Sequence, residues 1–318
     1  MGELLEARVA RRVDEGAVAI VDLVAGGAKA LPKFEPGAHV DVYLGDGLVR
    51  QYSLCNDPED ARIYRLGVLL DPASRGGSAA FHAQLHEGAR VTIGAPRNSF
   101  PVAEGAPAHV LIGGGIGITP MIAMAFSLHA RGRRIELHYC ARSRVSSAFI
   151  NDLAASSFSA HVHFHFDDGP EDQRLQADKV LNDAAKGGAH VYVCGPAGFM
   201  KWIEARSAAC EVPQDLLHRE SFGGEVDVSG EGFEVEAARS GVSVHVAPGE
   251  TIARALAKSG VFVPVACEEG VCGTCECTVL AGECDHRDSY LTAQERVAGD
   301  RIIACCSRAA GDRLVLDI

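Results

Sequence analysis

The sequence has no long apolar run, no excess of basic residues, and no repeat or low-complexity tract. None of its apolar stretches reaches the roughly 20 residues of a membrane-spanning helix, so we expect no membrane association. The 30 lysines and arginines are outnumbered by 42 aspartates and glutamates. The resulting net charge of −12 argues against a nucleic-acid partner. Such a charge either serves solubility or steers the protein toward a basic partner protein.

The sequence also lacks a recognisable export signal at its start, although it contains 11 cysteines. Disulfide frameworks are typical of oxidising compartments. The combination therefore favours reduced thiols or metal ligands, and we expect a cytoplasmic location. A chain of 318 residues is long enough for two or three domains.

Four cysteines near the C-terminal end form an ordered set. Cys267, Cys272 and Cys275 read C-x4-C-x2-C, and Cys305 follows thirty positions later. This is the spacing with which plant-type ferredoxins bind a [2Fe–2S] cluster. A zinc knuckle would need a second C-x2-C arm, which is missing here. The pattern predicts a site that transfers one electron at a time.

The residues around these cysteines fit a tight, cluster-binding loop. Gly270 and Gly273 can adopt positive φ and let backbone N–H groups approach sulfur. The segment before the loop, 251–260, predicts a short helix closed by a glycine. The segment after it, 275–280, predicts a strand. Helix, loop and strand together indicate a small β-grasp module.

Other cysteines lie close enough to be mistaken for ligands. Cys277 and Cys284 are near the loop, and Cys306 directly follows Cys305. Cys305 comes after the apolar run 302–304, where plant-type ferredoxins place their fourth ligand. We therefore assign Cys305 as the ligand and Cys306 as a packing residue.

The first 103 residues predict an antiparallel barrel. Short apolar stretches such as 18–23, 39–44 and 63–68 are separated by Gly and Pro turns. Two clusters within this part can carry chemistry, namely the run Arg50-Gln51-Tyr52-Ser53 and the run Arg75-Gly76-Gly77-Ser78. Arginine offers a fork for phosphate, and glycines that open a helix leave N–H groups facing an anion. Each run taken alone also fits a surface strand or an ordinary turn.

Residues 104–222 alternate strand and helix. A buried strand over 109–112 leads into the glycine turn 113–120 and then into a helix over 121–130. This order is typical of an α/β sheet that binds a nucleotide, although the turn only approximates the G-x-G-x-x-G fingerprint. A later strand ends in Cys194-Gly195-Pro196, at the expected carboxyl edge of the sheet. Taken alone, Cys194 also fits a buried small hydrophobe.

Histidines in this part give no metal pattern. The run 161–165 alternates His with apolar residues, which places three histidines on one face of a strand. No carboxylate or cysteine spacing accompanies them, so we interpret the run as a half-exposed strand. His138 and His218 in this part, and His245 further along the chain, appear isolated in the sequence.

A glycine- and acid-rich stretch, 223–232, predicts a linker before the cluster domain at 233–318. In order, the chain therefore presents an RxYS barrel, a GGxGxTP and CGP nucleotide domain, and a plant-type cluster. This joint pattern resembles the phthalate dioxygenase reductase family, including the vanillate demethylase reductases, over nearly the whole chain. Glu220-Ser221-Phe222-Gly223, Asp285-His286-Arg287-Asp288 and Cys306-Ser307-Arg308-Ala309 also match segments of that family.

The resemblance implies a multidomain α/β plus β protein, with a flavin-binding barrel, a parallel α/β nucleotide domain and a C-terminal β-grasp ferredoxin domain. The implied FMN residues are Arg50, Gln51, Tyr52, Ser53, Gly67, Arg75, Gly76, Gly77, Ser78 and Phe222. The implied NAD residues are Gly114, Gly115, Thr119, Pro120, Arg142, Ser143, Cys194, Gly195 and Pro196. Among these, Ser53 and Cys194 are expected beside the hydride path. The chain departs from family members that place a lysine near the flavin phosphate, because it has Leu69 there.

The resemblance also implies a function. Electrons would pass from NADH to FMN, then to the [2Fe–2S] cluster, and from there to a terminal Rieske oxygenase of aromatic catabolism. The family favours NADH, although Arg142 and Arg144 are placed where arginine can meet the 2′-phosphate of NADPH. The chain has no Rieske ligand pattern of its own, so oxygen chemistry would take place on the partner. We expect a monomer.

Two alternatives remain open at this point. The acceptor of the electrons could instead be a cytochrome P450 or a free ferredoxin. The chain could also be a passive cluster-bearing electron carrier with a degenerate nucleotide domain, although the intact 113–120 turn and the Cys194-Gly195-Pro196 run argue against this.

Overall fold

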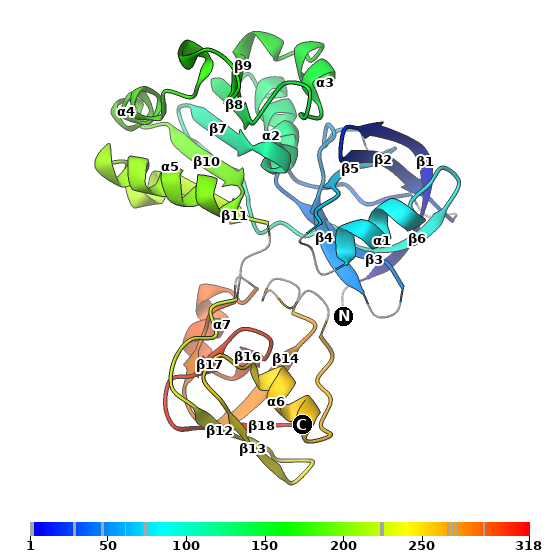
Figure 1. Cartoon of the computed structure of the whole chain (residues 1–318), viewed down its shortest axis with the longest axis vertical. Helices are drawn as coiled ribbons and strands as arrows, with labels where there is room; N and C mark the ends of the chain where they lie inside the picture. Colours follow the sequence, from blue (N-terminus) through cyan, green and yellow to red (C-terminus); the bar gives the residue numbers. More distant parts are fainter. Residues whose placement is uncertain are drawn as a thin grey trace. The chain divides into compact units, whose positions relative to one another are not determined.

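The structure is a computed structural model, and it describes residues 3–27, 30–45, 48–60, 62–72, 76–222, 226–265, 268, 270, 273–288 and 290–318, without the side chain of residue 293. The chain divides into two compact units (Figure 1). The larger unit is made of most of residues 2–222, and the smaller one chiefly of Gly223–Ile318. Within the described residues, no helix is long and apolar enough to cross a bilayer.

The first part of the larger unit is a six-stranded sheet with the order β4-β3-β6-β1-β2-β5. Its strands are β1 (Leu4–Glu15), β2 (Val18–Ala25), β3 (His39–Tyr43), β4 (Val49–Ser53), β5 (Tyr64–Leu69) and β6 (Arg90–Gly94). The pairings of β1 with β2 and β6, of β2 with β5 and of β3 with β6 are antiparallel. Burial alternates along the first half of β1, as expected for a strand with one face on a core. The predicted antiparallel barrel is confirmed.

Helix α1 (Gly77–Gln84) lies against this sheet (Figure 1). It begins after Gly76, whose φ of 83° is in the left-handed region. Its C-terminal end is bound by Arg12 of β1, which donates to the carbonyl oxygens of His82 and Leu85 at 2.6 and 3.2 Å. Its N-terminus has no side-chain cap. One end of the helix is thus anchored, and the other is open for an anion.

The second part of the larger unit is a five-stranded sheet with the order β11-β10-β7-β8-β9. Its strands are β7 (His109–Gly114), β8 (Ile135–Ala141), β9 (Val162–Phe166), β10 (His190–Gly195) and β11 (Leu217–Ser221). All neighbouring pairs are parallel. Every residue of β7 is buried, which is typical of a parallel strand covered on both faces. The predicted parallel α/β nucleotide domain is confirmed.

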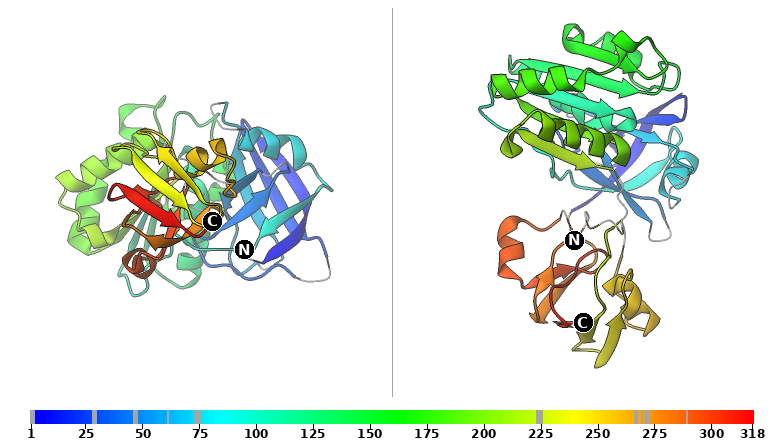
Figure 2. Two further views of the ribbon diagram at one scale, coloured as in Figure 1. Left: turned by 90° about the horizontal axis from the view of Figure 1, so that it is seen from below. Right: turned by 60° about the vertical axis from the view of Figure 1, so that its left-hand side comes forward.

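Helices cover both faces of this sheet (Figures 1 and 2). Leu111 of β7 packs into the core that contains α2, whereas Val110 and Ile112 pack into the core that contains α4 and α5. The α-helices are α2 (Ile118–Ala130), α3 (Ile150–Ala154), α4 (Ala177–Gly187) and α5 (Ala197–Ala209). Short 3-10 turns lie at η1 (Gly115–Gly117), η2 (Ser159–His161), η3 (Glu171–Gln173) and η4 (Gln214–Leu216).

The histidines of this sheet are not isolated, so that sequence prediction was wrong. His138 Nδ1 lies 3.0 Å from His165 Nε2, and His190 Nδ1 lies 2.8 Å from His218 Nε2. Burial lowers the pKa of His138 to about 3. These pairs arise because neighbouring parallel strands bring their histidines together, which sequence spacing does not reveal.

The smaller unit contains a five-stranded sheet with the order β13-β12-β18-β14-β16 and a separate β15-β17 pair. The strands are β12 (Phe233–Ala237), β13 (Val242–Val246), β14 (Glu276–Ala281), β15 (Cys284–Asp285), β16 (Arg301–Ile303), β17 (Arg308–Ala309) and β18 (Arg313–Leu316). The helices are α6 (Ile252–Lys258) and α7 (Ala293–Ala298). Thr251 caps α6 by accepting a hydrogen bond from Arg254 N at 3.1 Å, which confirms the helix predicted there. In the sheet of the same unit, His245 pairs with Glu234 at 2.9 Å, so it is not isolated either.

Part of the predicted linker 223–232 is bound to the smaller unit. Arg287 donates to the carbonyl oxygens of Asp227 and Ser229, both at 2.7 Å. Arg308 is almost fully buried, and it donates to the carbonyl oxygen of Glu231 at 2.9 Å. Residues 223–225 of that stretch lie outside the described residues. The segment from 226 onward therefore packs as part of the cluster domain.

Candidate cofactor sites

Strand β4 presents the predicted flavin residues. The ring of Tyr52 packs edge-on against Phe81 of α1, with centroids 5.0 Å apart. Gln51 donates to Asp41 Oδ1 at 3.0 Å, and Arg50 donates to the carbonyl oxygen of Val49 at 2.8 Å. These contacts fix a flat ring and a cation on one strand, which suits a flavin ring and its phosphate.

The phosphate end of the predicted site lies at the start of α1. Gly76 precedes the helix, a Cβ added to it would meet nothing within 4 Å, and Gly77 begins the helix without a side-chain cap. Ser78 is buried, and its hydroxyl accepts from Asp71 N at 3.1 Å. The uncapped amides fit the chemistry of a phosphate group. Arg75 lies outside the described residues, and Leu69 at the end of β5 is 39% exposed.

We expect Arg50→Ala to weaken FMN binding about 10- to 100-fold, because Arg50 is predicted to make a charge-assisted hydrogen bond to the flavin phosphate. The measurement is fluorescence titration of the flavin-free protein with FMN. Arg62→Ala is the matched control, because Arg62 is an exposed arginine of the same barrel that pairs with Asp60, two residues away. A variant of Arg50 that binds FMN as tightly as the Arg62 variant would contradict the assignment.

A half-buried glutamate of the nucleotide sheet lies next to the barrel. Glu220 on β11 lies opposite Cys194 on β10, and the Ser53 side chain of β4 lies close enough to the Glu220 carboxyl to influence its pKa. Its Oε2 is buried and makes no hydrogen bond with the described residues. Burial of the carboxyl raises the pKa of Glu220 to about 8, and the nearby Ser53 side chain opposes that rise. The structure therefore brings together Ser53 and Cys194, the two residues predicted to flank the hydride path, with Glu220 beside them.

Glu220 was not among the predicted site residues. The sequence showed it only as the first residue of a segment that matches the family. A carboxyl near the end of an edge strand, at the carboxyl edge of a parallel sheet, was a signal that could have identified it.

Cys194 is a buried thiol rather than a reactive one. It is fully buried, and burial together with the charge of Glu220 raises its pKa well above the usual range. Gly117 of η1 lies directly against it, since a Cβ there would be 2.3 Å from the Cys194 carbonyl oxygen. The glycine turn and the Cys-Gly-Pro turn thus meet at the carboxyl edge of the sheet.

The other predicted nucleotide residues surround this edge. A Cβ at Gly114 or at Gly195 would lie 2.7 or 2.8 Å from the ring of Phe199, so both glycines permit close packing. Gly115 adopts φ 55°, and Thr119 donates to the carbonyl oxygen of Ile116 at 3.0 Å. Pro120 is buried in the first turn of α2, and Pro196 is the N-cap residue of α5. Phe222, predicted to cover the flavin ring, is 37% exposed.

Arg142 and Ser143 follow β8 at the same edge. Ser143 Oγ lies 2.7 Å from Ser146 Oγ, and Arg142 is exposed. The backbone of the neighbouring strand end, Asp167 and Asp168, bonds to the carbonyl oxygens of Ala141 and Arg142.

The cluster site is described for two of its four predicted ligands. Cys275 and Cys305 are 1% and 3% exposed, and Ala304 N donates to the Cys275 carbonyl oxygen at 3.1 Å. The pairing of β14 with β16 therefore brings these two cysteines close together. Cys267 and Cys272 lie outside the described residues.

The loop glycines behave as predicted. Gly270 and Gly273 have φ of 74° and 71°. A Cβ at Gly270 would be 2.5 Å from Cys306 Sγ, and one at Gly273 would be 2.1 Å from the ring of Tyr290. The loop is thus packed so closely that only glycine fits at these two positions. Free thiols and a glycine-lined loop together fit the donor set of an iron–sulfur cluster.

Asp288 holds the segment that covers this loop. Its buried carboxylate accepts hydrogen bonds from Tyr290 N, Leu291 N and Ser307 Oγ at 3.1, 2.8 and 3.2 Å. Those bonds place the Tyr290 ring on Gly273. We infer that Asp288 is a positioning residue of the cluster loop. The sequence showed it only as part of a family segment.

Comparisons with known proteins agree with this arrangement. A model of the 2Fe-2S iron-sulfur cluster binding domain matches residues 235–310, and one of the oxidoreductase NAD-binding domain matches residues 111–205. The chain is 48% identical, over 91% of each chain, to a vanillate O-demethylase oxidoreductase of Pseudomonas sp. (strain HR199 / DSM 7063). It matches the solved structure of phthalate dioxygenase reductase with a TM-score of 0.72 and 34% identity, over 99% of this chain and 98% of that one.

A third similarity is to an intact type IV self-sufficient cytochrome P450 monooxygenase, with a TM-score of 0.82 and 38% identity. That match covers 99% of this chain and 41% of the longer one. The fold and sites thus define an NADH-dependent iron–sulfur flavoprotein oxidoreductase with FMN and a [2Fe–2S] cluster. The chain belongs to the phthalate dioxygenase reductase family, which includes the vanillate O-demethylase oxidoreductases.

Proposed function

We propose that this chain is the reductase component of a multicomponent Rieske-type aromatic oxygenase or O-demethylase. It passes electrons from NADH through FMN and the [2Fe–2S] cluster to a separate terminal oxygenase. The observation that carries the proposal is the meeting of Ser53 from the flavin strand with Glu220 and Cys194 from the nucleotide sheet, in a chain that also has a cluster domain. We further propose that it acts as a cytoplasmic monomer.

We assign one cofactor to each of the three parts of the chain. Residues 1–103 bind FMN, residues 104–222 bind NADH, and residues 233–318 hold the cluster. FMN, when bound, exchanges both electron pairs and single electrons, whereas the cluster takes one electron at a time. The chain's own task is to place these groups and to exclude water from the path between them.

The residues at the junction have distinct proposed roles. Ser53 donates a hydrogen bond toward the reactive edge of the flavin. Cys194 stays protonated, so it fills the space beside the nicotinamide without adding a charge. Glu220 holds a proton at neutral pH, because burial raises its pKa to about 8. Arg50, Gly76, Gly77 and Ser78, together with Arg75, bind the phosphate.

The test is an anaerobic titration of the purified protein with NADH, followed by visible absorption and low-temperature EPR. We expect the flavin band to bleach and a rhombic signal of a reduced [2Fe–2S] centre to appear. Bleaching without that signal would indicate a plain flavin reductase and would refute the assignment of Cys267, Cys272, Cys275 and Cys305. Absence of bleaching would refute the NADH-to-flavin step and favour a passive carrier.

A second candidate acceptor is a cytochrome P450, and the similarity to the type IV self-sufficient monooxygenase favours it. The two candidates are separated by supplying the NADH-reduced protein with a Rieske oxygenase or with a P450 haem domain and measuring the rate of acceptor reduction. Faster reduction of the haem domain would overturn the Rieske proposal without affecting the NADH-to-cluster part.

A further inference from the structure

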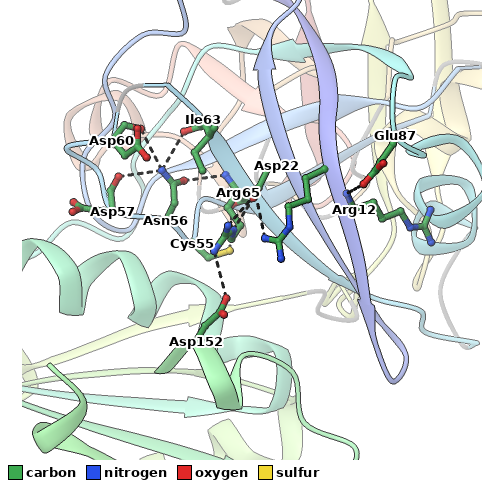
Figure 3. Close-up of polar contacts among 11 residues, drawn as sticks. Arg12, Asp22, Cys55, Asn56, Asp57, Asp60, Ile63, Arg65, Glu87 and Asp152 are labelled. Carbon is green, nitrogen blue, oxygen red and sulfur yellow. Dashed lines mark hydrogen bonds and ion pairs between the residues drawn. The ribbon is translucent and has the colours of Figure 1, made fainter. Parts of the chain in front are cut away.

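The start of helix α3 is tied to the flavin barrel by three contacts. Phe149 N donates to Glu15 Oε2 of β1 at 2.6 Å. Asp152 in the first turn pairs with Arg65 of β5 at 3.4 Å, and Arg65 is itself held by Asp22 of β2 (Figure 3). The third contact is the ring of Phe149, which lies against Gly67 of β5. This segment therefore joins the two halves of the larger unit.

Phe149 is held in an unusual backbone conformation. It has φ 64° and ψ 6°, in the left-handed region that bulky residues rarely adopt. Its side chain is 1% exposed, inside the main core of the nucleotide domain. Such a residue persists only where its surroundings hold it in place, and Glu15 does so by accepting its N–H.

The ring of Phe149 packs against strand β5, next to the start of α2. A Cβ at Gly67 would lie 2.5 Å from Phe149 Cζ and 3.1 Å from Thr119 Cγ2. Gly67 belongs to the strand assigned to the flavin, and Thr119 to the turn assigned to the nicotinamide nucleotide. The ring therefore lies against Gly67 of β5, at a point where β5 also comes close to Thr119 at the start of α2.

We propose that Phe149 is a positioning residue that sets the separation between strand β5 and the turn 115–119, and with it the donor–acceptor distance for hydride transfer. The proposal rests on the proposed function. Hydride transfer needs the reacting atoms about 3–3.5 Å apart, and a displacement of about 1 Å costs on the order of 100-fold in rate. A rigid ring seated on a glycine is suited to hold such a distance, whereas a flexible side chain is not.

The test compares Phe149→Leu with Phe158→Leu. Phe158 is an equally buried phenylalanine of the same core, and it packs edge-on against Phe126 within the nucleotide domain at 4.9 Å. Both variants should lose similar thermal stability. We expect the limiting rate of flavin reduction in stopped flow to fall about 10- to 100-fold in Phe149→Leu only, with a larger isotope effect from 4-deuterated NADH. The apparent Kd for NADH should stay within about 3-fold.

A second set of variants tests the contact between Gly67 and the Phe149 ring directly. Gly67→Ala should slow flavin reduction, because its new methyl group would displace the Phe149 ring. The double variant Gly67→Ala, Phe149→Leu should reduce faster than Gly67→Ala alone, since leucine vacates that space. If the effects of the two single substitutions on the rate of flavin reduction simply add in the double variant, the proposed contact is wrong.

A readout without cofactors separates this inference from the proposed function. In flavin-free protein, hydrogen exchange of β5 and of residues 115–119 should increase in Phe149→Leu and stay unchanged in Phe158→Leu. Equal exchange and equal rates in both variants would overturn the positioning role. If NADH fails to reduce the wild-type flavin, the proposed function is wrong, and the exchange comparison still decides whether Phe149 couples the two elements.

Discussion

Cys305→Ser should abolish the cluster and stop electron delivery to a protein acceptor, with a fall of at least about 100-fold, because a [2Fe–2S] cluster requires four thiolates. Oxidation of NADH by a two-electron quinone acceptor should stay within about 2-fold of wild type, since the flavin reaction takes place in the larger unit. The measurements are iron content, the EPR signal of the reduced cluster and both acceptor assays.

Cys306→Ser is the matched control for this experiment. Cys306 is adjacent and equally buried, at 1% exposure, but its sulfur lies near the carbonyl oxygen of Ile303 and beside Gly270. We assign it to packing, so its variant should keep the cluster and the acceptor rate. Loss of iron from Cys306→Ser with retention in Cys305→Ser would reverse the ligand assignment. Equal loss of both electron-transfer activities in Cys305→Ser would refute the ordered pathway.

In Glu220→Gln, the pH dependence that this carboxyl gives to the free energy of unfolding and to the rate of flavin reduction should disappear. Burial raises the pKa of Glu220 from 4.5 to about 8, so the folded state binds its proton more tightly than the unfolded state does. Protonation of Glu220 therefore contributes to the free energy of unfolding. This contribution is fully present below about pH 4.5 and is lost as pH rises through about 8. The loss amounts to a few kcal/mol at most, of the order expected for a shift of this size.

Thermal unfolding from pH 5 to 9 tests this expectation. The wild-type protein should lose more stability across this range than Glu220→Gln, and the two should be most similar near pH 5. The limiting rate of flavin reduction should likewise lose its inflection near pH 8 in the variant, while Ser53 keeps a hydrogen-bonding neighbour. Glu204→Gln is the control, because Glu204 is a surface carboxylate paired with Arg219. Parallel pH profiles in wild type and Glu220→Gln would show that Glu220 is not the titrating group.

The sequence was sufficient for the parts of the fold that depend on local pattern. The spacing of Cys267, Cys272, Cys275 and Cys305 indicated the cluster domain, and the matching family model covers that region. The strand, glycine turn and helix over 109–130 indicated a nucleotide domain, and the structure places β7 and α2 there. In these cases each chemical requirement is met by residues that are close together in the chain.

The sequence was insufficient where residues from distant segments meet. Glu220 became a site residue only because β11 pairs with β10 and faces Ser53 of the barrel. The histidine pairs depend on the register of parallel strands, and the left-handed φ of Phe149 depends on Glu15 at the end of β1. Predicting such contacts requires knowledge of which strands are neighbours, which composition and spacing do not contain.

The burial of Cys194 bears on the chemical durability of the enzyme. Peroxides and alkylating reagents attack the thiolate form of cysteine, and the extent of attack follows thiolate character and exposure. Cys194 offers neither, because it is fully buried and its pKa is raised well above the usual range. A sulfur atom protected in this way at the proposed hydride path would pass through many turnovers without itself being consumed.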